Sequence, residues 1–170
     1  SITANGTVTA LNSTAIYAEN EQTSTASDIT INAKNANGFD EGIKAVNYGS
    51  GSTIITATGT VKGGVGQSDK TANTDGIYAW NDANTTDLSI TVKDVTGLDD
   101  GIEATNKGTG FLSISVTGDV TSTSTDTSDG DYSYGIYASN YGTDLTVAAN
   151  GDVTSNDRGV YAWNDGSGKT

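Results

Sequence analysis

Short runs of alternating apolar and polar residues recur along the chain. Three of these runs place aliphatic side chains at every second position: Leu88, Ile90 and Val92; Leu112, Ile114 and Val116; Leu145, Val147 and Ala149. Strict alternation is the period of a β-strand that turns one face to a core and the other to water. Because no stretch has the 3.6-residue period of an amphipathic helix, the pattern predicts an all-β protein.

A second recurring feature is a hexamer that usually begins with glycine and always ends with asparagine. It is written AIYAEN, GIKAVN, GIYAWN, GIEATN, GIYASN and GVYAWN, with second positions at Ile16, Ile43, Ile77, Ile102, Ile136 and Val160. Neighbouring copies lie 24 to 34 residues apart, and a third apolar point follows each alternating run, as at Val61, Val120 and Val153. A repeat of this length is typical of solenoid proteins.

Three short strands per repeat, separated by polar turns, predict a parallel β-helix. We expect about six to seven coils, stacked roughly 4.8 Å apart, in one segment that covers residues 1–170. The two longest repeats carry insertions near residues 62–75 and 121–134, which we expect to leave the solenoid as loops at the same corner. Since the chain begins and stops inside a repeat, we also expect it to be a fragment of a longer array.

Two positions of the hexamer indicate structural columns along the solenoid axis. The final position is asparagine in all six copies: Asn20, Asn47, Asn81, Asn106, Asn140 and Asn164. Asparagine tolerates the left-handed backbone conformation at a corner, and stacked amides can hydrogen-bond along the axis. The first position is glycine in every copy except Ala15, which indicates a backbone bend with no room for a Cβ atom.

The charge of the chain restricts its partners. A formal net charge of −13 argues against nucleic acid and against an anionic membrane surface. No apolar run is long enough for a membrane span, so no direct membrane contact is expected in this segment. The chain has no cysteine and no histidine, which rules out disulfides, thiolate metal sites and an imidazole acid or base. We expect no cofactor.

Residues 135–168, GIYASNYGTDLTVAANGDVTSNDRGVYAWNDGSG, are similar to the passenger repeats of Gram-negative autotransporter proteins. In those passengers G-I-x-A-x-N, L-x-I-x-V and G-x-V-T segments alternate over long stretches. The resemblance covers essentially the whole chain, and its motifs define a fold without a catalytic signature. It implies a right-handed β-helix that is displayed outside the cell, on the surface of a Gram-negative bacterium.

Outward positions of the hexamer supply the first candidate binding residues. Tyr78 with Trp80, and Tyr161 with Trp163, form two aromatic pairs predicted to lie on one exposed face. Flat aromatic rings stack on the apolar faces of sugars, which would suit an adhesin that binds glycans. The alternative is that aromatic residues simply favour strands and cover the backbone.

Acidic residues precede the hexamer glycine in three consecutive repeats. Glu41, Asp75 and Asp100 would lie about 5 Å apart if the corners stack in register. Oxygen ligands of this kind suit Ca²⁺, but the spacing matches no calcium-loop motif, so we favour a solvated acidic corner without a metal. A paired carboxylate is also the minimum for glycoside hydrolysis, and a polysaccharide hydrolase or lyase stays open as an alternative.

The second insertion supplies the last candidates, namely Tyr132 with Tyr134, Asp126, Asp129 and Asp131, which a loop could present to a protein or a glycan. The alternative is a polar flap without a ligand. Taken together, the sequence predicts a non-enzymatic segment that mediates attachment to a host glycan or receptor, mediates self-association, or acts as a rigid stalk. A polysaccharide-active enzyme or a glycan-binding fibre segment is the alternative.

Overall fold

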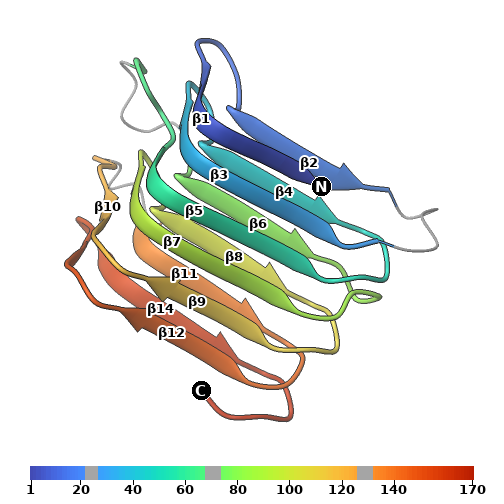
Figure 1. The fold of residues 1–170 in the computed structure, drawn as a ribbon. Coiled ribbons are helices and arrows are strands. Elements are labelled where there is room, and N and C mark those ends of the chain that lie inside the picture. The colour runs from blue at the N-terminus through green and yellow to red at the C-terminus, as the bar shows by residue number, and fades with distance from the viewer. Residues whose placement is uncertain (22–26, 68–73, 126–131) are drawn as a thin grey trace.

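The structure is a computed structural model that describes residues 1–21, 27–67, 74–125 and 132–170. Within these residues every regular element is a β-strand, which confirms the predicted all-β class. The strands form two sheets, and all strand pairs are parallel. Figure 1 shows the coils stacked along one axis, with β1 and β2 at one end and β12 and β14 at the other. The fold is therefore a parallel β-helix.

The six hexamers form the six-stranded sheet, here called the even sheet. Its strands are β2 (Ile16–Asn20), β4 (Ile43–Asn47), β6 (Ile77–Asn81), β8 (Ile102–Asn106), β11 (Tyr134–Asn140) and β14 (Arg158–Asn164). Equivalent hexamer positions pair directly, so that Ile43 lies opposite Ile77 and Asn81 opposite Asn106. The repeat read from the sequence thus corresponds to the register of the sheet.

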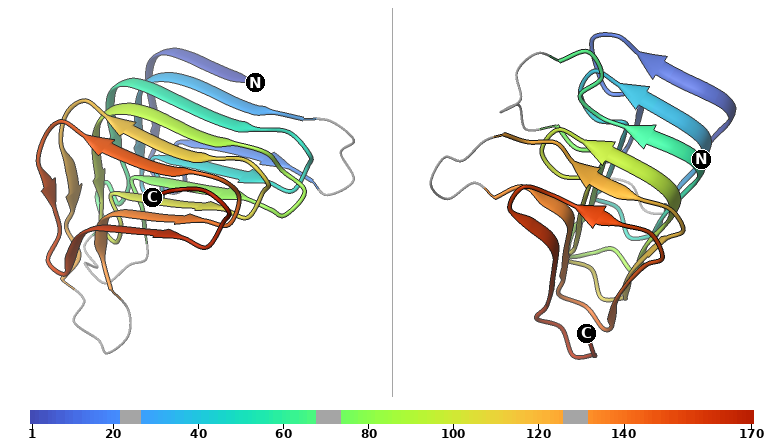
Figure 2. Two further views of the ribbon diagram at one scale, coloured as in Figure 1. Left: turned by 90° about the horizontal axis from the view of Figure 1, so that it is seen from below. Right: turned by 90° about the vertical axis from the view of Figure 1, so that its left-hand side faces the viewer.

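The alternating runs and the third apolar points form the eight-stranded sheet, here called the odd sheet. Its strands are β1 (Ile2–Ala10), β3 (Ile29–Gly38), β5 (Thr53–Lys62), β7 (Leu88–Gly97), β9 (Leu112–Val116), β10 (Val120–Ser122), β12 (Leu145–Ala149) and β13 (Val153–Thr154). The two predicted segments of a coil are continuous in β1, β3, β5 and β7, and separate only in the last two coils. Views from two other sides show how the two sheets enclose the interior (Figure 2).

Where the two segments of a coil meet, the pairing register between neighbouring strands shifts. β5 has one residue more than β3 and β7 at this point, because pairing resumes at Val61 opposite Ala36 and Val95 after the shift. An extra residue of this kind is a β-bulge, which increases local bending of the strand. β5 accommodates the extra residue and remains one continuous strand, as do β3 and β7 beside it.

Inward aliphatic residues form one continuous core between the sheets. Ile31, Ile55, Ile90 and Ile114 pair in successive coils, and all four are fully buried. Each such side chain contributes roughly 1.5–3 kcal/mol of burial free energy before conformational entropy is counted. Since each coil covers its neighbour, the core is thin across the solenoid but extended along it.

The asparagine column forms the amide ladder that the sequence predicts. Asn81 donates to Asn106 Oδ1 at 3.2 Å, Asn106 donates to Asn140 at 3.1 Å, and Asn140 donates to Asn164 at 3.0 Å. Asn20 donates to Asn47 in the same way. The predicted left-handed corner is wrong, because among the described residues no residue except glycine has a positive φ. Hydrogen bonding to the amides, rather than backbone conformation, explains the invariant asparagine.

The ladder is interrupted once, between Asn47 and Asn81. Here the Thr53 hydroxyl accepts from Asn47 Nδ2 at 3.3 Å and donates to Asn81 Oδ1 at 2.6 Å. Thr53 is fully buried and occupies the position at which neighbouring strands carry Ile29 and Leu88. The hydroxyl of this polar residue in an aliphatic column is thus hydrogen-bonded, because it bridges two residues of the asparagine column.

Close packing requires four of the five hexamer glycines, as predicted, namely Gly42, Gly76, Gly101 and Gly135. A Cβ atom on Gly159, in the outermost coil, would meet only the carbonyl oxygen of Val153 at 3.6 Å. A Cβ atom on Gly76 would lie 2.4 Å from Val95 Cγ1 and 2.6 Å from the carbonyl oxygen of Gly101. Ala15 is the exception, and the position of Val95 is taken in its coil by the smaller Ala36. The two departures from the repeat therefore compensate each other in volume.

Candidate functional site

The outer face of the even sheet carries two columns of side chains in register. The first column contains Tyr17, Lys44, Tyr78, Glu103, Tyr137 and Tyr161. The second contains Glu19, Val46, Trp80, Thr105, Ser139 and Trp163. Aromatic residues from these columns gather in two places, one over the first three coils and one over the last two.

The first place is a hollow over β4, here called the β4 groove. It has a volume of about 310 Å³ and is lined by Tyr17, Glu19, Lys44, Val46, Tyr48, Tyr78 and Trp80. Val46 is short and buried, whereas Tyr17 on β2 and Trp80 on β6 stand on either side of it. A small residue between two rows of large ones thus creates the hollow. A second hollow of about 280 Å³, lined by Ser13, Thr14, Tyr17 and Lys44, adjoins it.

Cations lie against the aromatic rings of the groove. Lys44 Nζ is 5.0 Å from the centroid of the Tyr78 ring, and Lys107 Nζ is 4.2 Å from the centroid of the Trp80 ring. Burial, followed by the charge of Glu103, raises the pKa of Tyr78 to about 12. Tyr78 therefore remains a neutral phenol at physiological pH.

The second place is a cluster of tyrosines around Arg158, here called the tyrosine cluster. The rings of Tyr137 and Tyr161 stack at 5.4 Å with an interplanar angle of 10°, and Tyr134 lies edge-on to Tyr137 at 5.2 Å. The Arg158 guanidinium lies 3.9 Å from the centroid of the Tyr132 ring and donates to the Tyr134 hydroxyl at 3.3 Å. One cation thus ties the end of the second insertion to the even sheet.

Both predicted aromatic pairs lie on the outer face of the even sheet, but the members of one pair pack on different neighbours. Tyr78 and Trp80 line the same groove, as expected, but Tyr161 belongs to the tyrosine cluster and Trp163 packs edge-to-face on Tyr141 at 5.1 Å. Trp163 remains 39% exposed, and Tyr132 is 48% exposed. Whether any of these residues binds a ligand stays a prediction.

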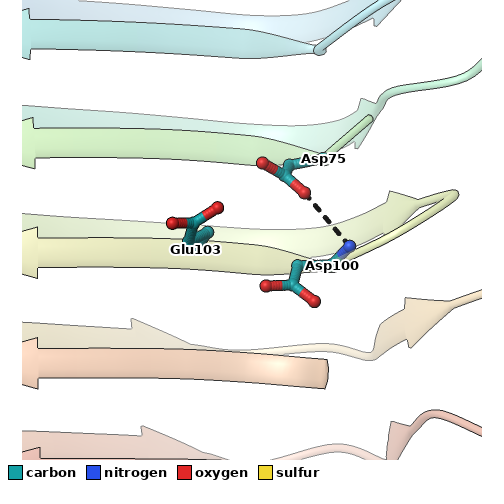
Figure 3. A group of neighbouring side chains, drawn as sticks. All are labelled: Asp75, Asp100 and Glu103. Carbon is teal, nitrogen blue, oxygen red and sulfur yellow. Dashed lines mark hydrogen bonds between the residues drawn. The ribbon is translucent and has the colours of Figure 1, made fainter. Parts of the chain in front are cut away.

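Asp75, Asp100 and Glu103 form a compact acidic cluster beside the even sheet. Each of the three has a carboxylate oxygen within 4.8 Å of the others (Figure 3). Asp75 Oδ1 accepts the backbone N–H of Asp100 at 3.1 Å, and Asp100 Oδ1 accepts the backbone N–H of Tyr134 at 2.6 Å. Each aspartate therefore binds the corner of the next coil, which gives it a structural role.

The predicted solvated acidic corner is wrong for the two aspartates. Asp75 is 2% exposed and Asp100 is 5% exposed, since the coils on either side cover them. Glu41, the third predicted member, is held elsewhere: it accepts from Thr14 Oγ1 at 2.5 Å and from Lys44 Nζ at 2.9 Å. Glu103 takes its place in the cluster, although it comes from the outward column of Tyr78.

Burial controls the protonation of the acidic cluster. Burial, together with the negative charges of Glu103 and Asp100, raises the pKa of Asp75 well above its usual range. The pKa of Glu103 is also raised, first by burial and then by the charge of Asp99. A proton held between these carboxyl groups reduces their mutual repulsion, as a cation would. The oxygen ligands are of the type that Ca²⁺ accepts, but the predicted trio of Glu41, Asp75 and Asp100 is not brought together.

Sequence reasoning missed Lys107, Tyr48, Glu103 and Arg158 as members of these sites. Lys107 and Tyr48 directly follow hexamer asparagines, so their position in the turn after each Asn was the available signal. Asp126, Asp129 and Asp131 of the second insertion lie outside the described residues. That both insertions leave the solenoid as loops at the same corner therefore remains a prediction.

In the part of the chain that the structure describes, no helix has the length and apolar character needed to cross a membrane. Comparisons of the chain with protein-family models, with curated proteins and with solved structures found no significant match.

Proposed function

We propose that the chain is a rigid adhesive segment of a bacterial surface protein, displayed outside a Gram-negative cell, that mediates attachment or self-association. The observation that carries this proposal is the aromatic outer face of the even sheet. The inward and asparagine columns are accounted for by the core and the amide ladder, whereas the β4 groove and the tyrosine cluster face outward on the same sheet. Outward aromatic side chains on a rigid scaffold are well suited to contact a partner.

The resemblance to autotransporter passengers supports the location on the cell surface. The stacked coils support a mechanical role, because each coil is hydrogen-bonded to its neighbours along both sheets. A stalk that only holds other regions away from the cell would have the same scaffold without a need for the groove. The groove also favours the alternative of a glycan-binding fibre segment, which would use the same face without surface anchoring by a passenger.

Residues 1–170 can be tested by display on a non-aggregating bacterium through an inert surface anchor. We expect displaying cells to sediment faster, or to adhere to host epithelial cells more strongly, than cells with the anchor alone at equal surface density. A double variant, Tyr161→Ala with Trp80→Ala, should lose this effect while the anchor level is unchanged. Adhesion and sedimentation equal to the anchor alone would contradict an adhesive function and favour the stalk.

A further inference from the structure

We propose that the β4 groove is a binding site for a neutral oligosaccharide, which lies along β4 and stacks on Trp80. This inference deepens the proposed adhesive function and rests on it. Three features of the groove carry the proposal: its shape, the ring face that it leaves open, and its balance of charge.

The shape of the groove fits an extended, narrow ligand. The hollow lined by Tyr48 and Trp80 adjoins the one lined by Ser13 and Thr14, and the two share Tyr17 and Lys44. Thr14 precedes β2 and Tyr48 follows β4, so the combined groove follows the strands from one corner to the other. Five strand residues span roughly 16 Å, which is long enough for more than one sugar ring.

Trp80 offers one ring face to the groove. Lys107, which covers this ring, directly follows β8, and β8 pairs with the side of β6 that is opposite β4. The cation therefore supports the indole from behind, and the other face is turned toward β4. The indole nitrogen is buried and has no hydrogen-bond partner among the described residues, so the polar edge of the ring is turned into the protein. An apolar face of a pyranose ring can stack on such a platform.

Polar groups on the floor and wall of the groove match hydroxyl groups. Lys44 Nζ donates to Glu41 at 2.9 Å and retains further donor capacity toward the groove. The Tyr17 hydroxyl donates to Glu19, and this hydrogen bond, followed by burial, raises the pKa of Tyr17 to about 12. The groove thus has a donor in Lys44 on β4 and an acceptor in Glu19 on β2, the strand that lies across β4 from Trp80.

The charge balance favours a neutral ligand. Lys44 forms an ion pair with Glu41. The positive charge of Lys107, which lies against the Trp80 ring, offsets the negative charge of Glu19, which lines the groove. The chain as a whole carries a net charge of −13, which repels sulfated or uronic-acid polymers at long range. A sugar without charge encounters no such barrier.

Binding can be measured with cellohexaose, chitohexaose and maltohexaose as probes and heparin as the anionic comparison. Replacing Trp163 by Phe leaves Trp80 as the single tryptophan, so its fluorescence reports on the groove alone. We expect at least one hexasaccharide to shift this emission in a saturable way, with a Kd of about 1 mM or tighter. The Kd should not change between about 50 and 500 mM salt, because no charge is neutralised.

Calorimetry on matched variants identifies the platform. Trp80→Ala should weaken binding at least about tenfold and Trp80→Phe should retain part of it. Phe111→Ala, which removes an exposed aromatic side chain directly before β9 of the odd sheet, should bind like the unchanged chain. Thermal melts of all variants establish that they fold. No saturable binding by the three hexasaccharides, unchanged affinity in Trp80→Ala, or salt-sensitive binding of heparin alone would each overturn the proposal.

The two proposals can fail separately. If displayed cells still adhere or aggregate when Trp80 is replaced by Ala, the groove is not the site and the adhesive function stands. If the hexasaccharide binds but displayed cells neither adhere nor aggregate, the binding site stands and the adhesive function falls.

Discussion

Replacing Thr53 by Val tests whether the polar ladder or the aliphatic column controls this position. The two side chains have almost the same shape, and the substitution exchanges a hydroxyl for a methyl group. Thr53 is fully buried, in a column where other coils carry Ile29, Leu88, Leu112 and Leu145. If burial of apolar surface alone mattered, Thr53→Val would stabilise the protein by about 0.8 kcal/mol.

The hydrogen bonds of the structure predict the opposite sign. Without the hydroxyl, Asn81 Oδ1 loses the 2.6 Å donor, whereas Asn47 Nδ2 keeps the carbonyl oxygen of Gly51 at 3.3 Å. One buried acceptor without a partner costs about 1–3 kcal/mol. Subtracting the gain of the methyl group leaves a net loss of roughly 0.2–2 kcal/mol in the free energy of unfolding.

Thermal and urea unfolding followed by circular dichroism measure this loss. For a chain of this size, 1 kcal/mol corresponds to about 2–4 °C, so we expect the Tm to fall, by up to about 8 °C. Thr56→Val is the matched control, because Thr56 lies on the outward side of the same strand, and it should change stability by less than about 0.5 kcal/mol. A Tm of Thr53→Val equal to or above that of the unchanged chain would refute the bridging role.

Three further predictions follow from the corners and columns. Gly76→Ala should lower the free energy of unfolding by about 1–3 kcal/mol or more in a urea titration, because its Cβ atom meets Val95 at 2.4 Å. Gly6→Ala is the control, since its Cβ atom meets nothing within 4 Å, and it should be neutral or slightly stabilising. Equal effects of the two substitutions would contradict the packing argument. Asn106→Ala removes the hydrogen bonds to Asn81 and Asn140 and should cost about 3–5 kcal/mol of folding free energy. Asn164→Ala, in the outermost coil, should cost clearly less. Thermal melts that rank the two variants in the reverse order would count against the ladder. The pKa values of Asp75 and Glu103 are raised in the folded state, so their stabilising contribution is complete below about pH 4 and is lost as the pH rises through the raised values. Asp75→Asn should therefore gain stability relative to the unchanged chain as the pH rises above about 4. A Tm difference that does not vary with pH would exclude the shared proton.

The comparison between Asp75→Asn and the unchanged chain is necessary because other carboxyl groups titrate in the opposite sense. Backbone and side-chain hydrogen bonds from Ser52 lower the pKa of Asp28, and the Lys93 side chain lowers that of Asp94. Their contribution is lost as the pH falls below about 4, so it does not vary across the window in which Asp75 and Glu103 act. Asparagine at position 75 mimics a protonated aspartate, since it keeps an acceptor for the N–H of Asp100 and adds a donor.

The fold could be predicted from the sequence because stacking repeats one environment in every coil. Positions that point inward, such as Ile77 and Ile90, meet the same neighbours in each coil and are therefore constrained to the same residue type. The amide ladder could be predicted for the same reason. The left-handed corner could not, since asparagine is suited both to that backbone conformation and to hydrogen bonding, and composition alone does not separate the two.

The acidic cluster and the groove could be predicted only in part, because both join residues from different columns. Glu103 stands in the outward column of Tyr78, but its side chain lies close to Asp75 of the preceding coil. Burial of Asp75 and Asp100 depends on how the neighbouring coils cover that corner, and a repeat alignment contains no such information. Lys107 reaches the Trp80 ring from a turn, where the alternation of inward and outward residues no longer applies.

Departures from a column are therefore the informative positions in this chain, and the direction of the side chain decides how to interpret them. An inward departure must be compensated inside the coil stack: Thr53 by the two amides that it bridges, and Ala15 by the small Ala36. An outward departure has no such constraint, so it changes the surface instead. Val46, between Glu19 and Trp80, creates the groove in this way, and its small size costs the core nothing. One outward side chain can thus shape the groove that we propose as a binding site, without altering the columns that hold the coils together.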